Sequence, residues 1–124
     1  MDAAELKKLQ TLIRLASLAK ESKASQLARL QEAELATAAQ IENLKTETPN
    51  FSWDSSVNGG EKARRTWTEK NLRQSNIVRA QLAAKIELAK REYQVALGKF
   101  DVLERMYQRQ KAIVKSGGPG EPYL

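Results

Sequence analysis

Apolar residues recur along the first part of the chain with the three-four spacing of a heptad repeat. Counted from Leu6, this spacing selects twelve positions, and eight of them are apolar. The pattern is typical of a helix that packs against another along one seam. The twelve positions are Leu6, Leu9, Ile13, Ala16, Lys20, Lys23, Leu27, Leu30, Glu34, Thr37, Ile41 and Leu44.

This first seam is polar at two places, the Lys20/Lys23 pair and the Glu34/Thr37 pair. Leu35 and Ala38 each lie one position after a member of the second pair. An apolar residue displaced in this way predicts a shift of the stripe, as in a stutter. We therefore expect an imperfect seam whose apolar face changes position near residue 35.

A second seam in the later part of the chain is more regular, with eight successive apolar positions. No strand-like alternation accompanies either seam, and long uncapped helical patterns of this kind indicate a coiled coil. The eight positions are Leu82, Ile86, Ala89, Tyr93, Ala96, Phe100, Leu103 and Tyr107. The register continues outward to Leu72 and Val114, with lapses at Ser75, Arg79 and Gln110.

The segment between the two patterns has the composition of a loop, TPNFSWDSSVNGG. Asp2 can cap the first helix, with Glu5 three residues later. We predict an all-α fold, a long antiparallel two-helix coiled-coil hairpin with a short loop and a flexible C-terminal tail. Residues 1–115 form this single hairpin, with helices over about 3–47 and 61–115, the loop over about 48–60 and the tail over 116–124.

Each helix carries more apolar residues near the chain termini than a two-helix seam requires. Leu12, Leu15 and Ala19 form a second stripe in the first helix, and Val102, Met106 and Ile113 lie beside the seam of the second. An antiparallel hairpin brings these stripes to the same end. The surplus has three interpretations: self-association into a dimer or four-helix bundle, docking to a different protein, or ordinary exposed hydrophobic residues without a partner.

The composition of the chain excludes several classes of chemistry. The chain has no Cys and no His, which removes thiol chemistry, imidazole bases and the common zinc ligand sets. We therefore expect no cofactor, no metal site and no enzymatic activity. The N-terminal sequence is acidic and lacks a secretory apolar region, so a cytoplasmic location is expected.

The net charge of +6 is concentrated in the second half of the chain. Residues 1–60 hold seven basic and eight acidic side chains, whereas residues 61–124 hold fourteen and seven. Near the turn, Trp53 and Trp67 lie close to Arg64 and Arg65. This cluster is either a cap on the hairpin end or an anchor for a partner, since Trp and Arg are enriched at interface hot spots. Binding of nucleic acid by stacking is the less favoured alternative.

The long segments LKKLQTLIRLASLAKESKASQLARLQ (residues 6–31) and AKREYQVALGKFDVLERMYQRQ (89–110), with the Trp-containing turn between them, resemble a known family. They are similar to the flagellar export protein FliJ and its YscO-type relatives of type III secretion. The likeness covers nearly the whole chain and lies in architecture and spacing. Members of that family resemble the central stalk of rotary ATPases.

The resemblance implies that the end carrying both termini inserts into a hexameric export ATPase ring. Its candidate ring-facing residues are Leu9, Leu12, Leu15, Met106 and Ile113. The hairpin tip would face the membrane export gate through Trp53, Trp67, Arg64 and Arg65. Export chaperones are further implied partners, and the implied location is cytoplasmic and peripheral at the inner face of the cell membrane.

Two other functions stay open from the sequence. One is a self-associating structural coiled coil with no ATPase partner, which would be a homo-oligomer. The other, less favoured, is an adaptor that binds nucleic acid or a membrane surface through the basic second helix, with affinity that falls steeply as salt rises.

Overall fold

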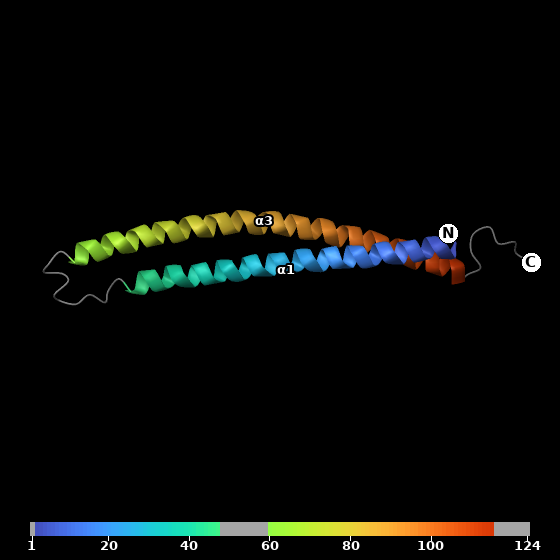
Figure 1. Cartoon of the computed structure of the whole chain (residues 1–124), viewed down its shortest axis with the longest axis horizontal. Coiled ribbons are helices and arrows are strands. Elements are labelled where there is room, and N and C mark those ends of the chain that lie inside the picture. Colours follow the sequence, from blue (N-terminus) through green and yellow to red (C-terminus); the bar gives the residue numbers. More distant parts are fainter. Residues whose placement is uncertain (1, 48–59, 116–124) are drawn as a thin grey trace, which may run out of the picture. The chain divides into compact units, whose positions relative to one another are not determined.

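The computed structural model describes residues 2–47 and 60–115, and these form two helices. Helix α1 covers Ala3–Glu47 and helix α3 covers Gly60–Lys115 (Figure 1). The described residues contain no strand, and the two helices pack against each other in opposite directions. The predicted all-α helical hairpin is therefore confirmed.

The helix bounds agree closely with the sequence pattern. Helix α1 has the predicted limits, and α3 begins one residue earlier than expected, at Gly60. Residues 48–59 of the predicted loop, among them Trp53, and the predicted tail over 116–124 lie outside the described residues.

Asp2 caps the start of α1 as its sequence position predicts. The backbone N–H of Glu5 donates a hydrogen bond of 2.8 Å to the Asp2 carboxylate, and the Asp2 carbonyl accepts one of 3.0 Å from the N–H of Leu6. The carboxylate thus satisfies one of the N–H groups that the first turn leaves without a helical partner. This contact explains why the helix begins at Ala3.

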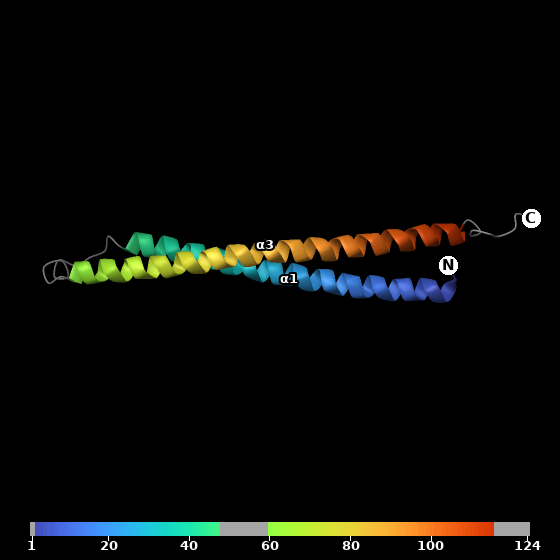
Figure 2. The ribbon, with the colours of Figure 1, turned by 90° about the horizontal axis from the view of Figure 1, so that it is seen from above.

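Contacts along the helices group into two compact units. Unit 1 comprises Met1–Gln26 and Ala89–Leu124, and unit 2 comprises Leu27–Leu88. Within each unit, one segment of α1 lies beside one segment of α3 (Figures 1 and 2). The structure therefore groups the contacts between α1 and α3 into two units, where the sequence predicted a single hairpin over residues 1–115.

The seam of unit 1 buries Leu9 and Ala89 and accommodates its two lysines through contacts across the helices. The Lys20 ammonium lies 4.1 Å from the centre of the Phe100 ring. Lys23 Nζ donates a hydrogen bond of 2.8 Å to Glu92 Oε2. A cation over an aromatic face and an ion pair are both favourable at such partly exposed positions. The first polar break is therefore bridged by partners from α3.

The seam of unit 2 buries Ile41 of α1 and Ile86 of α3. Thr37, one turn before Ile41, is also buried, and its hydroxyl donates a hydrogen bond of 2.9 Å to the Ala33 carbonyl one turn earlier. This bond satisfies the hydroxyl, so Thr37 can occupy a seam position. The second polar break thus keeps the heptad register.

The predicted stutter near residue 35 is wrong. Leu35 is 72% exposed and Ala38 is half-buried, whereas the seam position Thr37 is buried and the seam position Glu34 is half-buried. A shift of the stripe would have turned Leu35 inward. The seam does not shift because the Thr37 hydroxyl is satisfied within its own helix and Glu34 remains only half-buried.

Candidate partner-binding surface

The helix pair of unit 1 has two flanks, one on each side of its seam, and one of them is polar. On this side the Gln10 side-chain amide donates a hydrogen bond of 2.7 Å to the Tyr107 hydroxyl. Gln10 and Tyr107 line a small groove together with Ile13, Arg14, Glu104 and Gln108. The direct hydrogen bond between the helices and the charged neighbours make this flank a polar surface.

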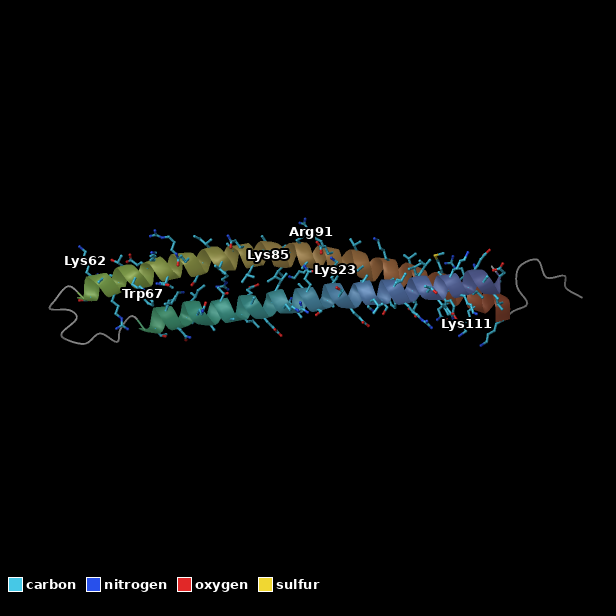
Figure 3. All side chains as sticks on the ribbon, in the orientation of Figure 1. Lys23, Lys62, Trp67, Lys85, Arg91 and Lys111 are labelled. Atoms are coloured by element: carbon cyan, nitrogen blue, oxygen red, sulfur yellow. The ribbon has the colours of Figure 1, made fainter. Side chains whose placement is uncertain are left out.

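The opposite flank contains a shallow groove of about 380 Å³ with an aliphatic floor. Seam positions 16 and 96 are both alanines, and their short side chains leave the depression between the helices. Charged side chains from both helices stand around it, and Lys23 and Arg91 are labelled in Figure 3. The lining residues are Ala16, Ala19, Lys23, Arg91, Glu92, Val95, Ala96 and Lys99.

Apolar side chains extend this groove toward the chain termini. Leu12 lies seven residues before Ala19, and Val102 lies seven residues after Val95. Positions one heptad apart lie on the same side of a seam. Leu12 is 50% exposed, and the large side chains nearby are exposed as well. We call this surface the apolar flank and define it by Leu12, Leu15, Ala16, Ala19, Val95, Ala96, Val102 and Met106.

The border of the apolar flank is mainly basic. Arg91 and Lys99 line the groove directly. Residues one heptad apart lie in the same row along a helix. The exposed Lys8 therefore shares the row of Leu15, and the exposed Arg109 shares the row of Val102. Arg105, also exposed, lies two heptads after Arg91. Acidic groups on this side are Glu92, which is paired with Lys23, and Glu5 in the row of Leu12. The border therefore carries a net positive charge.

The five residues that the sequence predicted to face an ATPase ring differ in exposure. Leu12, Leu15 and Met106 are exposed and belong to the apolar flank. Ile113 continues the row of Met106 but is half-buried. Leu9 is only 4% exposed and occupies the seam, so its assignment to a docking surface is wrong. Its side chain is already enclosed by the partner helix and is not available to a second protein.

Of the residues predicted at the hairpin tip, Trp67, Arg64 and Arg65 are exposed on the first turns of α3. Arg65 donates a hydrogen bond of 3.0 Å to Glu61, one turn earlier, which offsets part of its charge. Trp67 and the exposed Lys62 project from the same stretch (Figure 3). Unit 2 thus presents an aromatic ring among basic side chains, and Trp53 lies outside the described residues.

Sequence reasoning missed the groove itself, although a signal for it exists. Leu88, Val95 and Val102 recur at seven-residue intervals in a row that is not part of the seam. All three are more than half exposed. An apolar heptad row outside the seam indicates a second packing surface on the same helix.

The described residues offer no group of three or more acidic side chains that could hold a metal ion. Neither α1 nor α3 has a stretch apolar enough to cross a membrane. No family model, curated protein or solved structure matches this chain. Function must therefore be argued from the apolar flank and from the exposed residues at the start of α3.

Proposed function

We propose that this chain is a non-enzymatic stalk or adaptor resembling FliJ in flagellar or type III protein export. Unit 1, which contains both ends of the chain, would dock into a hexameric export ATPase ring. The basic, aromatic start of α3 would contact the membrane export gate. The protein would then lie on the cytoplasmic side of the membrane, with export chaperones as further partners.

The observation that carries this proposal is the apolar flank of unit 1. The seam residues of a two-helix hairpin cover one another, but Leu12, Leu15, Val102 and Met106 remain exposed on one side. Contiguous exposed apolar surface marks an interaction site more often than scattered residues do. A stalk that docks at its termini end requires such a surface there.

The proposed mechanism uses no catalytic residue in this chain. A helical hairpin inside a ring of six like subunits cannot contact all of them equally. Unequal contacts favour different nucleotide states in different subunits, because a ligand shifts a conformational equilibrium by its differential affinity for the states. We expect the result to be faster ATP hydrolysis by the assembled ring.

The test measures ATP hydrolysis by the export ATPase of the same organism, with and without this protein. The variant Leu12→Asp/Leu15→Asp places two charges on the apolar flank. Its matched control is Leu18→Asp/Leu35→Asp, because Leu18 and Leu35 are exposed residues of the same helix outside that flank. Circular dichroism first establishes that both variants are equally helical.

Stimulation by the native chain and by the control, but not by Leu12→Asp/Leu15→Asp, would support docking through the apolar flank. Absence of stimulation together with failure to co-elute with the ATPase would overturn the proposal. Sedimentation at several concentrations would then test the self-associating coiled coil. Binding to DNA and to anionic vesicles over a range of salt would test the adaptor alternative.

A further inference from the structure

We propose that the apolar flank of unit 1 binds one amphipathic helix of a partner protein, and that acidic residues border the apolar stripe of that helix. This inference rests on the proposed function in one respect, since it describes the partner segment that the same surface would take. It goes further by specifying the shape and the charge of that segment.

The shape of the flank suits a helix. The groove runs between two helices, with Ala16 and Ala96 on its floor, and larger apolar side chains extend it toward the chain termini. Helices pack by placing ridges of side chains into grooves of this kind. A third helix on this flank would cover Leu12, Val95 and Val102 together.

The polar flank gives no comparable site. The hydrogen bond from Gln10 to Tyr107 crosses the seam on that side, and Arg14 and Glu104 border the groove there. An apolar helix that docked on the polar flank would remove water from these groups. It would offer no hydrogen bonds in place of those to water, and such burial of polar groups is costly. The contrast directs an apolar helix to one side of unit 1.

The charge of the border specifies the partner. Arg91 and Lys99 line the groove, and Lys8, Arg105 and Arg109 continue the adjacent rows. Glu92 is engaged by Lys23 at 2.8 Å and so adds little negative potential. A partner helix with Asp or Glu beside its apolar stripe would meet opposite charges along both edges, and charge complementarity of this kind selects one partner over others.

The same charges argue against a second copy of this chain as the occupant. A two-fold symmetric dimer through the apolar flank would place one surface against itself. The basic borders of the two copies would then meet, and like charges in contact are unfavourable. The apolar flank is therefore suited to a different chain.

The test uses the whole chain and two synthetic helical peptides. Both peptides carry leucines in a heptad stripe, and they differ only in having Glu or Lys at the positions beside the stripe. Fluorescence anisotropy measures their binding at moderate salt. We expect the acidic peptide to bind at least about tenfold more tightly than the basic one.

Two charge-reversed variants locate the binding site. Arg91→Glu/Lys99→Glu changes the border of the apolar flank, and its matched control Arg14→Glu/Lys111→Glu makes the same net change in unit 1 outside it. We expect the first variant to lose the preference for the acidic peptide and the control to keep most of it. Circular dichroism verifies that both variants are folded.

Three results would overturn the inference: no binding of either peptide, equal binding of both, or equal loss of the preference in the two variants. A dimer of the native chain that Leu12→Asp/Leu15→Asp dissociates would also overturn it, in favour of a second copy. The peptide assay contains no ATPase, so its failure is separable from failure of the proposed function. Selective peptide binding, with neither ATPase stimulation nor co-elution with the ATPase, would uphold the inference and reject the stalk.

Discussion

Ile86 and Ile77 provide a matched test of the seam, because one helix of unit 2 places the same side chain in a buried and in an exposed position. Ile86 is 5% exposed at a seam position, and Ile77 is 52% exposed on the outer face of α3. The substitutions Ile86→Ala and Ile77→Ala remove identical atoms. A difference between them therefore reports the environment of each side chain.

The expected magnitudes follow from that environment. Full burial of an isoleucine side chain contributes about 1.5–3 kcal/mol, and a cavity left by truncation adds to the loss. Because a seam between two helices lets neighbours relax, we expect Ile86→Ala to lower the free energy of unfolding by about 2–3 kcal/mol. At Ile77 most of the side chain already meets water, and alanine is the better helix former by up to about 0.7 kcal/mol. Ile77→Ala should therefore change the stability by no more than about 0.5 kcal/mol.

Urea unfolding followed by far-UV circular dichroism measures both changes. The dependence of stability on urea should stay the same in the two variants, so that a shift in midpoint reports stability alone. Equal midpoint shifts for Ile86→Ala and Ile77→Ala would refute the heptad register of unit 2. A larger shift for Ile77→Ala would mean that the outer face of α3 is the one that packs.

Three further predictions concern single contacts. Lys23→Leu removes the ion pair with Glu92 but places an apolar side chain at a seam position. Exposed ion pairs contribute at most about 1 kcal/mol, so urea unfolding should show an unchanged or slightly higher stability. A loss of stability above about 2 kcal/mol would contradict this. Gly98→Ala should raise the free energy of unfolding by about 0.5–1 kcal/mol, and with it the melting temperature, because a Cβ there meets nothing within 4 Å and glycine is a poor helix former. A lower melting temperature would count against this prediction. Asp2→Ala removes the cap and should cost about 1 kcal/mol in the first turn, seen as faster hydrogen exchange at the start of α1, while unchanged exchange would reject the capping role.

Heptad spacing predicted the seam well because the repeat is a local property of each helix. Even its polar members, Lys20, Lys23 and Thr37, occupy covered or partly covered positions. Their partners could not be predicted in the same way. The contacts of Lys20 with Phe100 and of Lys23 with Glu92 depend on the register between two helices far apart in the sequence. No spacing within one helix contains that register.

The two errors have a common physical origin. Leu9 was assigned both to the seam and, through the family resemblance, to the ring-facing residues, and Leu35 was taken as a displaced continuation of the seam. Burial depends instead on which positions the partner helix covers, so an exposed leucine at position 35 is tolerated while Leu9 is enclosed. Prediction of the apolar flank from the sequence would have required one more observation. The alanines at seam positions 16 and 96 leave a space that larger side chains would have filled.

The basic residues around the apolar flank affect both self-association of the chain and its choice of partner. An exposed apolar stripe on a helical hairpin invites self-association, because the stripe on another copy offers the same apolar area. The basic side chains Arg91, Lys99 and Arg109 oppose that pairing through repulsion between copies. The same charges attract an acidic partner helix, so one set of residues disfavours the wrong complex and favours the right one. Reversal of Arg91 and Lys99 should therefore weaken partner binding and at the same time remove one barrier to pairing between copies.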